Sequence, residues 1–222
     1  MANSRPRPDQ PGGIGAKPGL TAALLAVAAA ASPARAGGPI DFAMVEGSSD
    51  SVTAVLVSAL GDTRAADPAP LLSASYTRWS DGQAGGIGIV KRWSFAADAH
   101  TVMLGAGAGA NGFSSRAPGD SYNDSALSLR LQAEALGPAP GGSYYALLQA
   151  SSFRNGWLAA AQYAPAGWPV GFELSHYAET SYNASTATLR IATGIEGWWL
   201  RLGAVNDFNG TRALLGISYN GF

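Results

Sequence analysis

The sequence predicts an all-β fold: a transmembrane antiparallel up-and-down β-barrel of about twelve strands, preceded by a cleaved signal peptide. Three observations lead to this prediction. They are an apolar leader at the N-terminus, short runs of alternating apolar and polar residues, and a low share of charged residues. Only 13% of the 222 residues are charged, against about 25% in an ordinary soluble domain. A transmembrane barrel fits this composition because each of its strands is apolar on only one face.

Residues 1–36 have the pattern of an export signal. Arg5, Arg7 and Lys17 form a basic leader, and residues 20–31 form an uncharged apolar run of twelve residues. A helix needs about 20 residues to span a bilayer, so this run is too short to do so. Ala34-Arg35-Ala36 supplies the small-x-small pattern of a cleavage site. The alternative is a retained anchor helix, but the basic flank and the short run favour cleavage after the last of these alanines.

Cleavage leaves a domain over residues 37–222 with 10 of the 14 basic and 14 of the 15 acidic residues, a net charge of −4. Such a chain lacks the basic patch by which proteins bind nucleic acid, so no nucleic-acid partner is expected. There is no cysteine, which excludes disulfides and cysteine-based metal sites.

The mature chain is a series of alternating runs separated by turns rich in Gly, Pro, Asn and Asp. The clearest run is Leu127 to Ala135, in which odd-numbered residues are apolar and even-numbered residues are polar. Successive side chains of a strand point to opposite faces, so one face of this strand is oily. Twelve is an even number, as expected for a bacterial single-chain barrel; the count falls to ten if the first two runs, which alternate poorly, are not strands. The expected strands are residues 40–47, 51–60, 70–79, 86–95, 100–110, 125–136, 143–152, 156–164, 169–178, 184–194, 197–206 and 211–222.

The connections fit a barrel whose N-terminus lies on the periplasmic side. By this count the longest connection, Asn111 to Asp124, falls outside the cell, where such barrels carry their long loops. Tight turns at 137–140 and 194–197 fall on the periplasmic side. The connection from Gly61 to Ala69 is an exception, because it has nine residues and falls on the same side.

Aromatic residues are expected near both ends of the strands, as in the two interfacial belts of a membrane barrel. The alternative is a soluble β-sandwich, which would place its aromatics in mid-strand. The residues near the periplasmic ends are Trp93, Tyr144, Tyr145, Tyr163, Trp168, Trp198, Trp199, Tyr219 and Phe222, and those near the external ends are Trp79, Phe153, Trp157 and Tyr177.

The C-terminus Tyr219-Asn220-Gly221-Phe222 resembles the assembly signal of bacterial outer-membrane proteins, which is a terminal Phe on a final alternating strand. In that pattern the aromatic residue two before the end shares the phase of the last residue, whereas here Tyr219 and Phe222 differ in phase. The resemblance implies a place in the outer membrane of a Gram-negative bacterium, with outer-membrane lipid and the barrel-assembly machinery as partners.

A second resemblance covers about residues 120–222. The chain there is similar in layout to the cellulose-biosynthesis protein BcsS family, small barrels encoded with cellulose synthase in alphaproteobacteria. This resemblance implies an accessory role in envelope polysaccharide export, with export components as partners. It rests on the succession LRLQAEALGPAPGGSYYALLQASS, VGFELSHYAE, LRLGAVND and ALLGISYNGF.

The sequence offers little support for an enzyme. A lipid-modifying hydrolase needs a serine activated by a histidine, and the only candidate region is around Ser175 and His176. These two residues are adjacent and point to opposite faces of one strand, so a histidine at the membrane rim is the better interpretation. We expect no catalytic residues, no metal site and no cofactor.

The polar faces of the strands predict a cluster of charges in the lumen. Glu173, Arg190 and Arg201 lie on three consecutive strands at similar depth, and we expect them to form one cluster, with an acid such as Glu134 able to reach it from across the lumen. Lumen charges either line an aqueous path or pair with one another and close it, and pairing is favoured because lone charges in a narrow interior are costly. The predicted members are Glu173, Arg190, Arg201, Arg130, Glu134 and Arg212.

Three functions follow as hypotheses. The first is a non-enzymatic barrel acting as a small channel or as an accessory to polysaccharide export. The second is a plugged structural or adhesive barrel that acts through its external loops. The third is a lipid-modifying outer-membrane hydrolase.

Overall fold

The computed structural model describes residues 40–60, 69–117 and 120–220. The predicted signal peptide, the terminal Phe222 and most of the connection from Gly61 to Ala69 lie outside the described residues. The residues that flank this connection are described, and they are joined by a hydrogen bond: the Leu60 amide donates to the Pro70 carbonyl at 2.9 Å.

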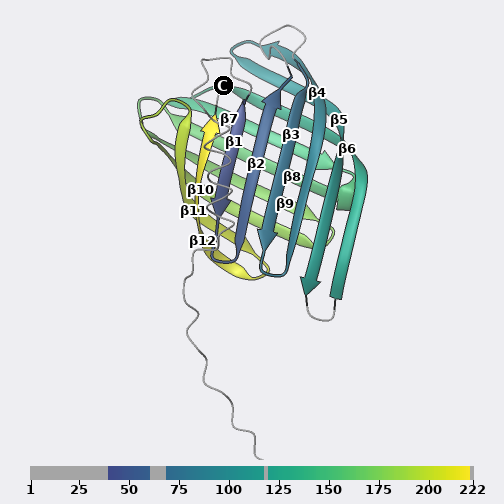
Figure 1. Cartoon of the computed structure of the whole chain (residues 1–222). Coiled ribbons are helices and arrows are strands. Elements are labelled where there is room, and N and C mark those ends of the chain that lie inside the picture. The colour runs from purple at the N-terminus through teal and green to yellow at the C-terminus, as the bar shows by residue number, and fades with distance from the viewer. Residues whose placement is uncertain (1–39, 61–68, 118–119, 221–222) are drawn as a thin grey trace, which may run out of the picture.

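Twelve antiparallel strands close into one barrel (Figure 1), as the sequence predicts. Each strand pairs with its neighbours in the chain, and β1 closes the ring against β12. No helix of the described residues is long and apolar enough to cross a membrane. The elements are β1 Phe42–Gly47, β2 Ser51–Ala59, β3 Leu71–Trp79, β4 Gly82–Ala97, β5 His100–Ala117, β6 Asp120–Ala139, β7 Gly142–Ser151, η1 Phe153–Asn155, β8 Gly156–Pro165, β9 Val170–Glu179, β10 Tyr182–Ala192, β11 Trp198–Asp207 and β12 Gly210–Asn220.

The two faces of the wall are as different as the alternation predicts. On β6, Leu127 and Leu131 point outward and are 85% and 62% exposed, whereas Arg130 and Glu134 point inward and are 8% and 5% exposed. The outward face therefore offers apolar side chains to a surrounding phase, and the inward face collects the charges. The predicted inward and outward phases of β6 are confirmed.

The predicted long loop from Asn111 to Asp124 is wrong. β5 and β6 continue through this segment as a paired ladder, with Asn111 opposite Ala126 and Phe113 opposite Asp124. The alternation stops here because small and polar residues occupy both faces, yet backbone hydrogen bonding does not require an apolar face. The β5–β6 hairpin extends past the other strands (Figure 1). The predicted turn at 137–140 is also displaced, because β6 pairs with β7 as far as Ala139.

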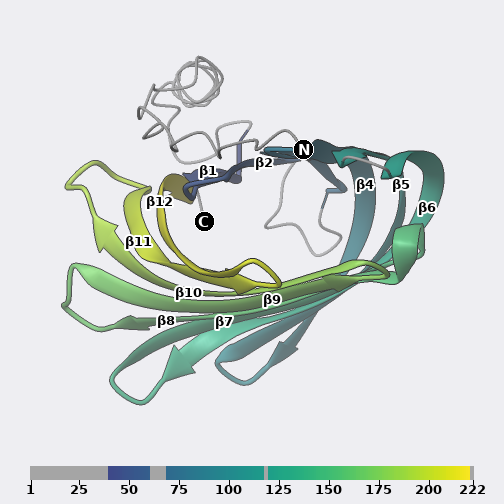
Figure 2. The same cartoon turned by 90° about the horizontal axis from the view of Figure 1, so that it is seen from below.

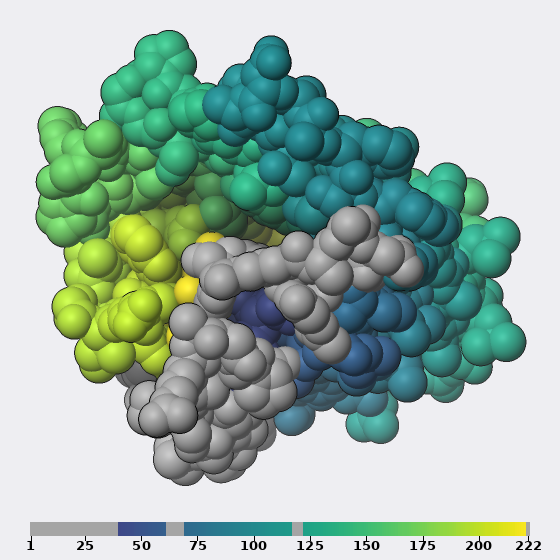
Figure 3. Space-filling view, turned by 90° about the horizontal axis from the view of Figure 1, so that it is seen from above, coloured from purple at the N-terminus to yellow at the C-terminus, as the bar shows by residue number. Residues whose placement is uncertain are grey.

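The barrel has two ends, a terminal end and a hairpin end. The terminal end is where β12 ends and where the turns β4–β5, β6–β7, β8–β9 and β10–β11 lie; the hairpin end is the opposite one, with the extended β5–β6 hairpin. Seen along its axis, the ring is flattened, with β1 and β2 facing β8–β10 (Figure 2). A space-filling view of the terminal end shows these turns standing around a hollow (Figure 3).

Candidate functional site

A chain of polar side chains follows the inner wall nearer the terminal end, and we call it the inner belt. Its members come from eight strands and are mostly buried. They are Glu46 of β1, Arg92 of β4, Glu134 of β6, Tyr145 of β7, Gln162 of β8, Glu173 of β9, Arg190 of β10 and Arg201 of β11.

Arg201 holds one half of the inner belt together. Its guanidinium bonds both carboxylate oxygens of Glu173, at 2.9 and 2.6 Å, and its Nε donates to Glu46 at 3.1 Å. Two parallel bonds of this kind are the strong geometry for an arginine and a carboxylate. Gly216 of β12 lies between Arg201 and Glu46 in the ladder, and its lack of a side chain lets Arg201 reach across. Arg201 is 2% exposed, so its charge depends on these partners.

Arg190 is directly opposite Arg201 in the ladder, an arrangement that repels two like charges. The structure relieves this by turning Arg190 to the other side. Its guanidinium donates to the Gln162 side chain and lies 4.9 Å from the centre of the Trp199 ring. Gln162 in turn donates to Glu173 at 2.9 Å. Arg190 thus joins the inner belt through a neutral bridge.

Glu134 organises the other half of the inner belt. It accepts hydrogen bonds from Gln132 at 2.7 Å and from the Tyr145 hydroxyl at 2.8 Å, and it pairs with Arg92 at 3.4 Å. Arg92 comes from β4 and Glu134 from β6, so the pair crosses β5 at Gly105. A Cβ atom at Gly105 would stand 2.7 Å from the Val90 side chain. Both halves of the inner belt therefore cross an intervening strand at a glycine.

Arg130 lies farther toward the hairpin end and, among the residues that the structure describes, bonds only neutral groups. Its guanidinium donates to Ser73 Oγ at 3.0 Å, to Asn111 Oδ1 at 3.0 Å and to the Ile87 carbonyl at 3.4 Å. It lies over Gly109, where a Cβ atom would come within 2.6 Å of Arg130 Nε. A buried guanidinium without a carboxylate partner contributes an uncompensated positive charge to this level of the lumen.

The lumen face of the hairpin end carries a second set of contacts, which we call the outer arc. Aromatic and charged side chains alternate along it, from β3 round to the β1–β2 turn. Its members are Trp79, Phe113, Tyr122, Asp124, Arg154, Tyr177, Glu179, Tyr182, Phe208, Asp207, Arg212 and Asp50.

The first half of the outer arc is built around Arg154. The Phe113 ring centre lies 5.5 Å from Trp79 and 6.2 Å from Tyr122, and the Arg154 guanidinium lies over Phe113 at 4.2 Å. A cation over an aromatic face is a favourable contact. Arg154 also bonds Glu179 at 3.0 Å. It thereby ties the β5–β6 hairpin to β9.

The second half of the outer arc is built around Asp207. It accepts from the Tyr182 hydroxyl at 3.2 Å and from Arg212 at 2.5 Å. Arg212 also pairs with Asp50 of the β1–β2 turn at 3.1 Å. Tyr177 and Tyr182 connect the two halves, with ring centres 6.2 Å apart.

The six residues predicted for the lumen cluster lie at four separate places. Glu173 and Arg201 are in direct contact and Arg190 joins them through Gln162. Glu134 does not come to them from across the lumen, because it belongs to the Arg92 half of the inner belt. The remaining two, Arg130 and Arg212, lie separately, the latter in the outer arc.

Sequence reasoning missed Arg92, Glu46 and Gln162. Arg92 follows glycines on the inward face of β4, and Glu46 follows the inward apolar Met44, so neither lies in a clear polar phase. A signal did exist for Arg92: Ile87 and Ile89 are 60% and 44% exposed on the outward face, and their spacing fixes the inward phase of the strand.

The aromatic belts are confirmed only in part. At the terminal end, Trp198 and Tyr219 lie together on the outward face with ring centres 5.6 Å apart, as an interfacial belt requires. Tyr145, in contrast, points into the lumen. At the hairpin end, Trp79 and Tyr177 also face the lumen rather than the outside, because they share the phases of Ser73 and Glu173 on their strands.

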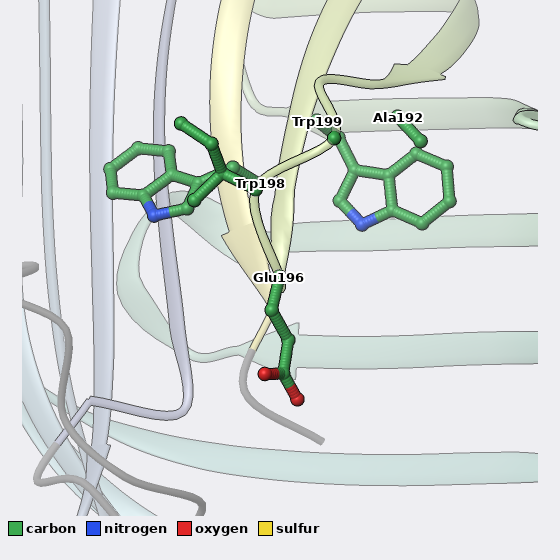
Figure 4. Close-up of a pocket in the computed structure, with 7 residues that line it drawn as sticks. Ala192, Glu196, Trp198 and Trp199 are labelled. Atoms are coloured by element: carbon green, nitrogen blue, oxygen red, sulfur yellow. The ribbon is translucent and has the colours of Figure 1, made fainter.

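A pocket lies at the β10–β11 turn of the terminal end (Figure 4). Trp198 and Trp199 point away from each other on either side of the turn, and Glu196 points away from the barrel. Trp199 stands beside Ala192, its partner in the ladder. The pocket is an open, shallow depression between Trp198 and Trp199. Each of these rings has another partner, Tyr219 for Trp198 and Arg190 for Trp199.

His176 points outward, as its phase predicts, and Ser175 points inward to Thr186. On the outward face the His176 Nδ1 lies 2.8 Å from the hydroxyl of Ser185, its ladder partner on β10. The Trp157 ring lies beside the imidazole, with ring centres 5.0 Å apart. A Ser–His contact is therefore present, formed by a serine that the sequence did not single out.

Comparison with solved structures gives the fold a precedent. A KdgM porin is similar over 82% of this chain and 98% of its own, with 13% identity and a TM-score of 0.51. A chain solved in work on the in-meso crystallization of membrane proteins is similar over 81% of this chain and 82% of its own, with 12% identity and a TM-score of 0.51. A KdgM porin in complex with disordered oligogalacturonate has 14% identity and a TM-score of 0.49 over 82% and 98%.

No protein-family model matches the sequence, and no curated protein does either. At these identities the structural likeness concerns the fold, which is that of a porin-like barrel.

Proposed function

We propose that this protein is a non-enzymatic outer-membrane channel for small solutes. The observation that carries the proposal is the direction of the lumen contacts. The ion pairs of the inner belt join strands two apart in the ring, Arg201 to Glu173 and Arg92 to Glu134, and so run along the wall rather than across the lumen. Ion pairs that follow the wall do not bridge the lumen, as an open path for ions and polar solutes requires. The porin-like fold supports the same function.

Planar-bilayer recording of the purified, refolded chain tests the proposal. We expect discrete conductance steps on insertion. A barrel that inserts and resists unfolding in detergent but gives no conductance would overturn the channel and favour the plugged barrel instead. The adhesive version of that alternative has little support, because the segment predicted as its main external loop is a paired hairpin.

The location in the outer membrane is part of this proposal. Its support is the outward apolar surface, including Leu127, Leu129 and Leu131 of β6, which would face lipid acyl chains. Outer-membrane lipid and the barrel-assembly machinery are the expected partners, and cleavage after Ala36 is the expected maturation step. Mass spectrometry of membrane-extracted protein tests the maturation step, because the chain should begin at Gly37.

The accessory role in cellulose export stays a prediction from the sequence. Deleting the gene and measuring secreted cellulose tests it separately from the conductance of the barrel. Unchanged cellulose in the deletion strain would exclude that role.

A non-enzymatic barrel implies that the contact between His176 and Ser185 is not catalytic. Hydrolysis needs an oriented histidine and donors for the oxyanion, and within the described part of the chain His176 contacts Ser185 and Trp157 and no carboxylate. The backbone around both residues is engaged in the β9–β10 ladder. Ser185→Ala should leave envelope lipid composition unchanged; altered lipid acylation would favour the hydrolase.

A further inference from the structure

We propose that the outer arc is a binding site for neutral oligosaccharides at the mouth of the channel. This inference rests on the proposed channel and specifies what it would take up. Three observations carry it: the aromatic faces that remain exposed, the carboxylates between them, and the sign of the charge.

Aromatic side chains of the outer arc are partly or largely exposed. Tyr122 and Tyr177 are 46% and 37% exposed, and Phe208 at the β11–β12 turn is 74% exposed. Phe208 stands edge-on to Tyr182 with ring centres 5.9 Å apart. Interfacial anchors would point outward, whereas Tyr122 and Tyr177 share the inward phases of Arg130 and Glu173. Their exposed faces are therefore placed to contact a ligand inside the mouth.

A pyranose ring matches this surface chemically. Its C–H faces are apolar and pack against aromatic rings, while its hydroxyls surround the edge and need hydrogen-bond partners. Ligand sites of this kind combine apolar and aromatic walls with a few placed polar groups. In the outer arc the polar groups are interleaved with the rings: Asp124 beside Tyr122, and Glu179 bonded to the Tyr177 hydroxyl at 3.0 Å. Asp50 and Asp124 keep 33% and 31% of their side chains exposed.

The charge of the outer arc selects against an acidic sugar. Arg154 and Arg212 are its two cations, and both are already paired, with Glu179 and Asp207. Asp50 and Asp124 leave a surplus of two carboxylates. In the outer arc a uronate would meet like charge, and both guanidinium groups there are already paired, which disfavours binding. A neutral oligosaccharide meets no such penalty.

Current block in planar bilayers tests the inference, with cello-oligosaccharides as the neutral probe and oligogalacturonates as the acidic one. We expect cello-oligosaccharides to block the current at lower concentration than oligogalacturonates of the same length. Tyr122→Ala and Tyr177→Ala should each weaken this block about fivefold, from an aromatic contact of about 1 kcal/mol. Tyr76→Ala is the matched control, because Tyr76 is 45% exposed on the outward face and its loss should leave the block unchanged.

The outcomes separate the two proposals. Absence of conductance from a folded barrel defeats the channel, and calorimetric titration of the detergent-solubilised protein with the same sugars then tests the site alone. Conductance without block, tighter block by oligogalacturonates, or an equal loss in the Tyr76 control defeats the binding site. Tighter block by glucosamine oligosaccharides would replace the neutral ligand with a cationic one. If Tyr122→Ala does not fold, Tyr122→Leu removes the ring and keeps an apolar residue there.

Discussion

The inner belt and the outer arc use arginine in opposite ways. In the inner belt Arg201 is almost completely buried and bonds two carboxylates, one of which, Glu46, it reaches over a glycine. In the outer arc Arg154 lies against aromatic rings whose neighbours are exposed. The first arrangement balances charge within the wall, and the second leaves surfaces for a ligand. The comparison indicates that stability depends mainly on the inner belt and ligand selection on the outer arc.

The glycines distinguish the inward face of the wall from the outward face of the hairpin. Gly105 and Gly216 of the inner belt point inward and have no room for a side chain, whereas a Cβ atom at Gly112, on the outward face of the extended hairpin, would meet nothing within 4 Å. The inner belt is therefore packed closely against its backbone, and the outward face of the hairpin is open. Substitutions can test how far the two regions differ.

The largest expected effect is the loss of Glu173. Glu173→Ala removes the carboxylate that Arg201 bonds through two nitrogens, while Arg190 stays opposite Arg201 in the ladder, and removing one partner of a buried pair costs about 3–5 kcal/mol. The free energy of unfolding in urea measures this loss. Glu196→Ala is the control, because Glu196 is exposed in the β10–β11 turn, and it should change stability little. Combining Glu173→Ala with Arg201→Met should recover part of the loss. Equal effects of Glu173→Ala and Glu196→Ala would contradict the inner belt as the stabilising region.

The second effect compares the two faces of β6 at the level of the inner belt. Leu131→Arg places a charge on the outward face and should cost about 2–4 kcal/mol if this face meets the middle of a bilayer. Gln132→Arg places the same charge on the inward face, beside Glu134, and should cost much less. Unfolding of both variants in lipid vesicles measures the difference. Equal losses would mean that the outward face does not lie in lipid.

The third effect tests the glycine crossings. A Cβ atom at Gly216 would come within 2.6 Å of the Val45 carbonyl oxygen and 2.7 Å of Glu46 Cβ. Gly216→Ala must therefore shift β1 or the Arg201–Glu46 contact, and overpacking of this kind costs about 1–3 kcal/mol. Gly112→Ala should be neutral in the same urea assay, since the site is open. A destabilised Gly112→Ala variant would show that the hairpin is packed more closely than its surroundings suggest.

The sequence predicted the strands because the outward face is apolar and the inward face polar, which imposes a period of two. Leu131 and Gln132 follow that rule, and so the facing of β6 was predictable. From Asn111 to Asp124 the rule fails. The backbones of β5 and β6 pair there although apolar and polar side chains do not alternate along the strands. Phase also cannot say which partner a lumen charge takes. Arg190 faces Arg201 in the ladder but bonds Gln162 on the other side, a choice that depends on side-chain reach.

The smallest expected effect on stability is the loss of Arg154, and it should change conduction instead. Arg154 has a backbone φ of 53°, which glycine adopts without strain, so Arg154→Gly removes the side chain and keeps the turn. The side chains of Arg154 and Glu179 are only 9% and 7% exposed, so losing their ion pair has a cost. Glycine, however, relieves the positive φ, which costs other residues about 1–3 kcal/mol, and the two effects partly cancel. The guanidinium nevertheless joins the β5–β6 hairpin, through Phe113, to β9. Without it the two sides of the mouth are no longer tied, so we expect larger current fluctuations in bilayers with a nearly unchanged unfolding midpoint. Arg154→Lys keeps the charge but not the planar contact with Phe113. It should therefore show more than half of the increase in current fluctuations that Arg154→Gly shows. An Arg154→Gly variant with unchanged current noise and a stability loss as large as that of Glu173→Ala would reverse the assignment of the two regions.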